Sequence, residues 1–291
     1  MRRFRAISVL IPLVLLTLAP TSVLAQDAQT AKAEVAEAPE QNEAEAESFA
    51  PCEDIAPSMG CIPGGEFLRG SDDGPHDVRP QATIVLDTFY MDKHEVTVAE
   101  YEACVATGGC KKAKTNYVDY SRPLQPKVGV SWFHAVQYCE AQGKHLPTEA
   151  EWEYASRGGL DGAKYPWGDE EPDSGGAWRT NIWQGAFPHA NTLEDGFLTT
   201  APVRTFSPNG YGLWQTVGNV WEWCADWWDP RTYAASPPRN PQGPERGDVR
   251  VLRGGSFLCH ISYCNRYRNS ARSQNTPDSS MGNAGFRTVA A

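Results

Sequence analysis

The segment of residues 253–287 constrains this chain most, because it is long and fits neither a helix nor a strand. It lacks the 3.6-residue apolar period of a surface helix and the alternation of a long strand, and Pro277 and several glycines interrupt it. Aromatic side chains such as Phe257 and Tyr267 give it surface worth burying, so we do not expect disorder. The segment therefore predicts an ordered irregular loop, and long loops of this kind usually carry function.

Cys259 and Cys264 are the reactive groups of this segment. An odd spacing would place them on opposite faces of a regular strand, so a turn must bring the two sulfurs together. Two converging cysteines can close a small disulfide, exchange with another disulfide, or bind a soft metal such as Cu(I) or, with further ligands, zinc. In a secreted protein the spacing alone favours the structural disulfide.

The N-terminus has the pattern of a secretory signal over residues 1–25. Three arginines precede an apolar run over residues 7–18, and a small-residue cleavage site ends at Ala25. The apolar run is too short to span a bilayer comfortably. We therefore expect secretion across the inner membrane to the periplasm, with no stable membrane span after signal removal.

Residues 26–50 are rich in alanine and acidic residues and predict a disordered linker. The chain has a net charge of −10, which argues against a nucleic-acid partner. Residues 51–291 contain no second linker, and glycine and proline are frequent in them. We predict a single loop-rich α+β domain with little regular secondary structure.

Local signals place a few elements in this domain. Capping boxes at Thr97 and Thr148, together with apolar residues at helical spacing, favour helices over residues 97–108, 131–143 and 148–158. Short strands are predicted at residues 83–90, 202–206 and 249–252.

Two other groups of residues could carry chemistry. Glu149 and Glu153 share one helical face and could act as acid and base, but dipole complementation on a solvated face is the favoured interpretation. The six histidines form no HExxH motif. His260 lies next to Cys259 and could orient a thiol, although a lone histidine is more often a hydrogen-bonded bystander.

Several motifs of the C-terminal segment resemble those of the sulfatase-modifying factor family, which includes the formylglycine-generating enzyme. They are RGGS at 253–256, the two cysteines, RYR at 266–268, ARSQNTPDSS at 271–280 and GFR at 285–287. Further similar motifs occur at 64–67, 95–97, 146–154 and 218–223, so the resemblance covers roughly residues 58–289. It implies a compact domain of the formylglycine-generating-enzyme type, related to the C-type lectin fold.

The resemblance also implies a mechanism. Cys259 and Cys264 would bind Cu(I), a substrate cysteine would join them, and O₂ with a thiol reductant would convert that cysteine to an aldehyde. Ser256 and Trp221 match positions that line the oxygen pocket, and Cys264 matches the more exposed sulfur, which can form a mixed disulfide. The implied substrate is an unfolded sulfatase segment with the motif Cys-x-Pro-x-Arg.

The resemblance further implies two Ca²⁺ sites in oxygen-rich loops. The first would use the side chains of Asn181 and Asp195 with the carbonyls of Ile182 and Phe197. The second would use Glu222 with the carbonyls of Gly218 and Val220, but Gln215 replaces the usual asparagine. The alternative is that these polar residues only satisfy loop backbone.

The other six cysteines suit an oxidising compartment. Cys52 with Cys61, and Cys104 with Cys110, are close enough for local disulfides, although sequence alone cannot select a connectivity. Relatives bridge positions 139 and 288, and also 156 and 269, but this chain has Thr288, Ser156 and Asn269 there. We therefore hypothesise a disulfide between Cys139 and Cys224.

Two other functions stay open. A related periplasmic oxidoreductase, such as a siderophore-tailoring enzyme, would act on a small molecule. A non-catalytic lectin-like binding module would keep Cys259 and Cys264 as an inert disulfide.

Overall fold

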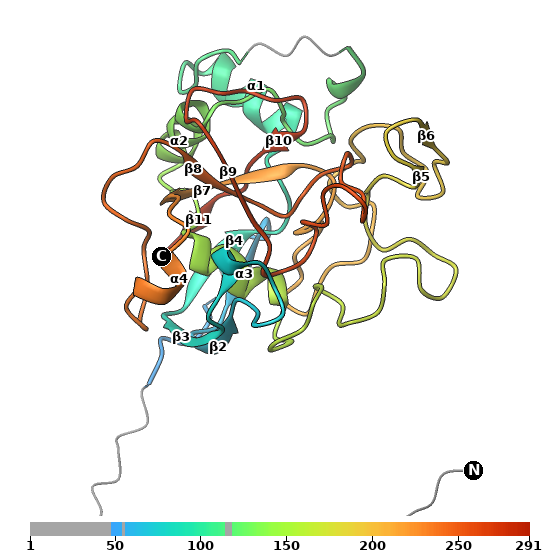
Figure 1. The fold of residues 1–291 in the computed structure, drawn as a ribbon. Coiled ribbons are helices and arrows are strands. Elements are labelled where there is room, and N and C mark those ends of the chain that lie inside the picture. The colour runs from blue at the N-terminus through green and yellow to red at the C-terminus, as the bar shows by residue number, and fades with distance from the viewer. Residues whose placement is uncertain (1–47, 54–55, 114–117) are drawn as a thin grey trace, which may run out of the picture. The chain divides into compact units, whose positions relative to one another are not determined.

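The computed structural model describes residues 48–53, 56–113 and 118–291 (Figure 1). The signal sequence predicted over residues 1–25 and nearly all of the linker predicted over residues 26–50 lie outside the described residues. In the part of the chain that is described, no helix is long and apolar enough to cross a membrane.

The three predicted helices are present, and each begins with a side-chain cap. Thr97, Ser131 and Thr148 each accept a hydrogen bond from the backbone N–H three residues later, and in each case the residue there bonds back. The third helix ends at Gly158, whose φ of 60° favours glycine. The helical elements are α1 (Val98–Ala106), α2 (Trp132–Ala141), α3 (Glu149–Arg157), the short α4 (Thr232–Ala235), and the 3₁₀ turns η1 (His76–Val78) and η2 (Val118–Tyr120).

Short strands form four small sheets among the described residues. Their orders are β1-β4-β11, β10-β7-β8-β9, β2-β3 and β5-β6, and only β10 and β7 pair in parallel. The strands are β1 (Met59–Ile62), β2 (Gly65–Arg69), β3 (Ala82–Leu86), β4 (Phe89–Asp92), β5 (Gly185–Ala186), β6 (Ala190–Asn191), β7 (Trp221–Trp227), β8 (Arg250–Arg253), β9 (Arg272–Asn275), β10 (Ala284–Gly285) and β11 (Val289–Ala290).

The strand predictions are correct in part. The strand predicted at 249–252 is confirmed as β8, and the one at 83–90 is two strands, β3 and β4. The strand predicted at 202–206 is wrong. Pro202 has no N–H for a ladder, and its carbonyl instead accepts a hydrogen bond from the N–H of Thr205, which closes a turn. The prediction of a loop-rich α+β domain is confirmed.

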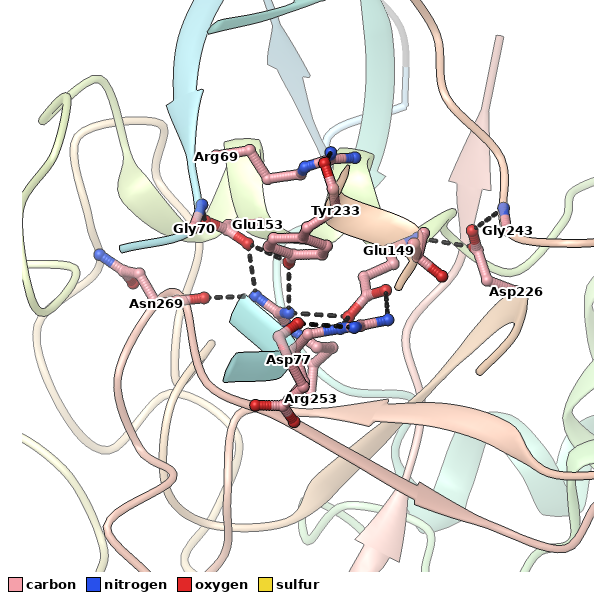
Figure 2. Close-up of polar contacts among 12 residues, drawn as sticks. Arg69, Gly70, Asp77, Glu149, Glu153, Asp226, Tyr233, Gly243, Arg253 and Asn269 are labelled. Carbon is pink, nitrogen blue, oxygen red and sulfur yellow. Dashed lines mark hydrogen bonds and ion pairs between the residues drawn. The ribbon is translucent and has the colours of Figure 1, made fainter. Parts of the chain in front are cut away.

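A buried network of charged side chains joins α3 to β8 and β9 (Figure 2). The guanidinium of Arg253 donates to Glu149 and to Glu153, at 2.8 Å in each case. Arg272 donates twice to Glu149, at 2.7 Å, and Arg157 donates to Glu153, also at 2.7 Å. The network therefore couples a helix to two strands that lie about a hundred residues later in the chain.

The expected solvated face on α3 is wrong, because Glu149 is only 3% exposed and Glu153 is fully buried. Burial alone would raise the pKa of Glu153, but the Arg157 and Arg253 guanidiniums hold it at about 2. These carboxylates are structural partners of arginine. The acid and base interpretation finds no support, since both groups are enclosed and fully ion-paired.

A second buried pair lies at the other end of residues 253–287. Arg287 donates from Nε and Nη2 to the two carboxylate oxygens of Glu222, at 2.8 and 2.7 Å, and both residues are fully buried. The irregular segment is thus fixed at both ends by ion pairs. Arg253 is shared between two glutamates, and Arg287 binds one glutamate through two hydrogen bonds.

We predict that Glu153→Gln lowers the free energy of unfolding by about 3–5 kcal/mol, because it leaves two buried guanidiniums without a full counter-charge. Urea denaturation at neutral pH measures the loss. Folding lowers the pKa of Glu153 to about 2. Its contribution to the free energy of unfolding is therefore fully present at pH values above the pKa of this carboxyl in the unfolded chain, and it is lost as the pH falls toward 2.

The matched control is Asp87→Asn, which removes one partner of the exposed Asp87–Arg239 ion pair and should cost less than about 1 kcal/mol. Equal losses of stability in the two variants would contradict this account. So would a Glu153→Gln variant whose free energy of unfolding falls at low pH as steeply as that of the wild type.

Candidate active site around Cys259 and Cys264

Cys259 and Cys264 meet in a tight turn, as predicted. Their Cα atoms are 4.7 Å apart and the two sulfurs form a disulfide. The turn is held by backbone bonds from Cys259 N–H to the Ser256 carbonyl and from Cys264 N–H to the His260 carbonyl, both 2.8 Å. Cys264, at 9% exposure, is the more accessible of the two, and Cys259 is 1% exposed.

Glycine is required where the segment leaves β8. Gly254 and Gly255 have φ of 89° and 75°, which favour residues without a Cβ. A Cβ on Gly254 would lie 2.7 Å from the Thr216 carbonyl oxygen. The RGGS motif therefore turns the chain sharply from the buried Arg253 toward the cysteine pair.

Ser256 and Trp221, both predicted site residues, are linked through Asn283. The Asn283 side-chain amide donates to the Ser256 hydroxyl at 2.9 Å. The backbone carbonyl of Asn283 accepts from the backbone N–H of Trp221 at 2.8 Å. Ser256 is fully buried, and Trp221 is nearly so. The sequence reasoning did not single out Asn283. The available sequence signal for Asn283 is its position just before the GFR motif. The next residue, Ala284 of β10, pairs with Trp221 of β7, and this pairing brings Asn283 to the site.

The outer surface of the turn is apolar. Leu258, Ile261 and Tyr263 are exposed, and Tyr263 is 74% exposed. The Phe187 ring stacks on Tyr263 with ring centroids 4.8 Å apart. His260 bonds through Nδ1 to the Ser262 hydroxyl at 2.7 Å, which agrees with the bystander interpretation of this histidine.

The first predicted calcium set comes together in the structure. The Asp195 carboxylate accepts from the N–H groups of Ile182 and Phe197 at 3.1 and 2.9 Å. Asn181 is fully buried, and its Oδ1 has no hydrogen-bond partner. Burial raises the pKa of Asp195. A buried acceptor without a donor beside a partly desolvated carboxylate suits a hard cation, so these residues fit Ca²⁺.

The second predicted set fits a cation less well. Both oxygens of Glu222 already accept from Arg287, and one also accepts from the Trp152 indole at 2.8 Å. Gln215 Oε1 accepts from the Thr205 N–H at 3.4 Å. The backbone of Gly218 and Val220 lies in the same turn before β7. Within the described ranges, no three or more His, Cys, Asp or Glu side chains gather as a metal site.

The two local disulfides, Cys52–Cys61 and Cys104–Cys110, are confirmed, with Cα separations of 5.8 and 5.3 Å. The predicted Cys139–Cys224 disulfide is wrong, because both cysteines are free and buried.

Cys139 lies in α2 and Cys224 in β7. Both are buried in the same core, where the Trp132 indole of α2 donates to the Cys224 carbonyl at 2.9 Å. Sharing a core does not by itself bring two sulfurs within bonding distance, since a disulfide needs Cα atoms within about 7 Å. At positions 156 and 269, where the resemblance implies a second bridge, the Ser156 hydroxyl donates to Asn269 Oδ1 at 2.9 Å.

The fold and the site define a class of loop-rich α+β domains that present a cysteine pair on an irregular C-terminal segment. The sulfatase-modifying factor enzyme 1-like domain matches residues 45–291, and the chain belongs to this family. The resemblance seen in the sequence is thereby confirmed.

Relatives and solved structures agree. The chain is 49% identical over 273 residues to a formylglycine-generating enzyme of Streptomyces coelicolor, covering 78% of this chain and 87% of that one. It is 42% identical over 276 residues to the formylglycine-generating enzyme of Bos taurus (79% and 73% covered). It is 35% identical over 283 residues to the inactive C-alpha-formylglycine-generating enzyme 2 of Mus musculus (79% and 85%). The structure of PvdO from Pseudomonas aeruginosa matches with a TM-score of 0.66 at 26% identity, covering 79% of this chain and 93% of that one.

We predict two reactive thiols per chain when the oxidised protein is unfolded in denaturant, from Cys139 and Cys224, and none while it is folded. Burial raises the pKa of both thiols, which slows their reaction further. Thiol titration with and without denaturant checks this, and prior reduction should raise the unfolded count to all eight cysteines. A count of zero in unreduced, unfolded protein would restore the Cys139–Cys224 disulfide.

Proposed function

We propose that this chain converts a cysteine in an unfolded sulfatase polypeptide, within the motif Cys-x-Pro-x-Arg, to Cα-formylglycine. The observation that carries the proposal is the tight turn that brings Cys259 and Cys264 together beside the buried Ser256. Membership of a family whose most similar relatives include formylglycine-generating enzymes supports it.

The proposed reaction needs O₂ and a thiol reductant to balance. The peptidyl CH₂SH group, O₂ and two reductant thiols give the peptidyl aldehyde, hydrogen sulfide, one disulfide and water. The substrate carbon is oxidised, its C–S bond breaks, and sulfur leaves as sulfide. One oxygen atom enters the aldehyde and the other leaves as water.

The cysteine pair suits Cu(I) in its reduced form. A reductant first opens the Cys259–Cys264 disulfide, and two thiolates already held in one turn then offer soft ligands to a soft ion. Bound copper would supply the one-electron chemistry with O₂ that side chains lack. Cys264 is the more exposed sulfur, so it faces the incoming substrate thiol, and the buried Cys259 completes the pair from within.

Neighbouring residues give this pair a fixed and partly dry surrounding. Asn283 orients the Ser256 hydroxyl, and Trp221 belongs to the same buried apolar cluster as the two cysteines. Because Ser256 is buried and its hydroxyl has a fixed orientation, water is excluded from this side of the cysteine pair. A site without water would favour reaction with O₂ over side reactions. The apolar turn surface at Leu258, Ile261 and Tyr263 suits an unfolded segment, which exposes apolar side chains of its own.

The proposed place of action is the periplasm, because the sequence predicts a cleaved signal over residues 1–25. Three disulfides agree with an oxidising compartment. Such a compartment also requires that a reductant reach Cys264.

We predict that copper-loaded protein, with a thiol reductant in air, forms an aldehyde on a Cys-x-Pro-x-Arg peptide, and that Cys264→Ser reduces the rate to background. Cys264 is the sulfur proposed to meet the substrate, so its loss removes the contact that starts the reaction. Mass spectrometry of the peptide measures the loss of sulfur. Ser262→Ala is the matched control, since it alters the same turn but keeps both sulfurs. Equal activity of Cys264→Ser and wild type would refute the mechanism.

We also propose Ca²⁺ at the first oxygen set and predict one tightly bound ion per chain. At a hundredfold excess over Kd, calcium should stabilise the fold by about 3 kcal/mol. Calorimetric titration and melting with and without chelator measure both effects. Asp195→Asn should abolish the stabilisation, whereas Asp119→Asn, an exposed acidic residue of η2, should leave it unchanged. A calcium response that survives Asp195→Asn would rule out this set.

A second candidate function is a non-catalytic binding module. It is favoured by the disulfide that joins Cys259 and Cys264, and by the relative named as inactive. An inert disulfide would resist mild reduction, and no aldehyde would form. If the thiols are free and bind copper but the peptide is unchanged, a small-molecule oxidoreductase becomes the better interpretation.

A further inference from the structure

A cavity of about 450 Å³ lies between two loops that are far apart in the chain, residues 122–125 and residues 197–202. Four apolar residues form most of its wall: Pro123, Leu124, Phe197 and Pro202. Its volume is within the range of sites for small organic ligands, which are mostly apolar with a few polar groups. None of its lining residues belongs to the segment 253–287, so the cavity is separate from the cysteine pair.

Hydrogen bonds hold the two loops together. The Gln125 side chain accepts from the backbone N–H of Arg122 and donates to the carbonyl of Thr200, at 3.1 Å in each case. The backbone N–H of Val203 donates to the Leu124 carbonyl at 3.0 Å. Gln125 and Thr200 are both buried. The cavity is therefore formed by the fold itself, and a ligand would not have to order its walls.

Two polar groups of the wall are not used by the rest of the protein. Arg122 is exposed, and among the described residues no carboxylate forms an ion pair with its guanidinium. Thr200 is buried, and its hydroxyl has no hydrogen-bond partner within the described ranges. In a chain with a net charge of −10, an arginine without an acidic partner beside an apolar cavity suits an anion from outside the chain.

The apolar part of the wall is open to solvent on one side. Leu124 is 65% exposed although it lines the cavity, and Leu198, which follows Phe197, is 63% exposed. The Phe197 ring packs edge-on against Phe206, with ring centroids 6.2 Å apart, which fixes the opposite loop. Covering these side chains with an apolar ligand would remove them from water, which favours binding.

An anion with an apolar chain matches both parts of the wall. A guanidinium binds a carboxylate through two parallel hydrogen bonds. A compact inorganic anion would leave the four apolar residues without contact, and a neutral hydrocarbon would leave Arg122 without a partner. The end of a polypeptide also carries a carboxylate, but its backbone N–H and C=O groups would need partners that a mostly apolar wall lacks.

We propose that this cavity binds a small aliphatic carboxylate, with the carboxylate at Arg122 and the chain against Leu124, Phe197 and Pro202. The proposal goes beyond the proposed function, since the reaction at the cysteine pair needs no such ligand. Phe197 also contributes its carbonyl to the first calcium set, so binding is measured with calcium present.

Calorimetric titration of the oxidised protein with sodium octanoate tests the proposal. We expect one site per chain, with an affinity that rises about three-fold per methylene from butanoate to octanoate, because each added methylene is buried. Arg122→Gln should weaken octanoate binding about five-fold, as for a partly exposed ion pair. Leu124→Glu should weaken it more than about ten-fold, because it places a like charge beside the carboxylate.

Arg204→Gln is the matched control. Arg204 is also exposed and lies two residues after Pro202, but it stacks over the Trp214 ring and does not line the cavity. This variant makes the same change of charge as Arg122→Gln, and its octanoate Kd should equal that of the wild type. Because Arg122, Leu124 and Arg204 are all exposed, thermal melting should show intact folding in each variant.

The absence of octanoate binding overturns the proposal. Octan-1-ol that binds as tightly as octanoate, or an equal loss of affinity in Arg122→Gln and Arg204→Gln, overturns the role of the carboxylate. An affinity that does not change from butanoate to octanoate overturns the role of the apolar wall. Tighter binding of acetyl-Gly-Leu with a free carboxylate than of octanoate also overturns the proposal, in favour of the end of a polypeptide.

Discussion

Buried pairs of arginine and carboxylate hold this domain in its fold. Arg253 bonds to Glu149 and Glu153, and Arg287 bonds to Glu222, all in the interior. Removing such charges from water is costly, and only the correct partner at the correct distance offsets the cost. A domain with short strands and long loops has few backbone ladders to select one packing. Here the penalty for leaving a buried charge unpaired disfavours the alternatives.

This arrangement explains how an irregular segment can position reactive groups. Residues 253–287 are fixed at both ends, and the bond between Asn283 and Ser256 joins two distant points within them. The glycines after Arg253 then permit one sharp turn, and the cysteine turn follows directly. A supporting shell of this kind fixes side-chain directions in a loop as firmly as a helix would.

What the sequence could predict was local. The caps at Thr97 and Thr148 lie within one turn of their helices, and the cysteine turn follows from spacing, so these predictions are confirmed. Glu153 was misjudged because its arginine partner Arg253 follows about a hundred residues later. Cys139 was misjudged because sharing a core does not bring sulfurs into bonding range. The role of Asn283 depends on the pairing of β10 with β7, which joins segments far apart in the chain.

The three disulfides join cysteines only nine, six and five positions apart. Short covalent loops restrict the unfolded chain little, so the long-range topology does not depend on sulfur chemistry. At positions 156 and 269, where the resemblance implies a bridge in other members, this chain has a hydrogen bond between Ser156 and Asn269. The architecture is therefore largely indifferent to redox potential. The proposed function requires a reductant to open Cys259–Cys264, and that step would leave the domain around the turn folded.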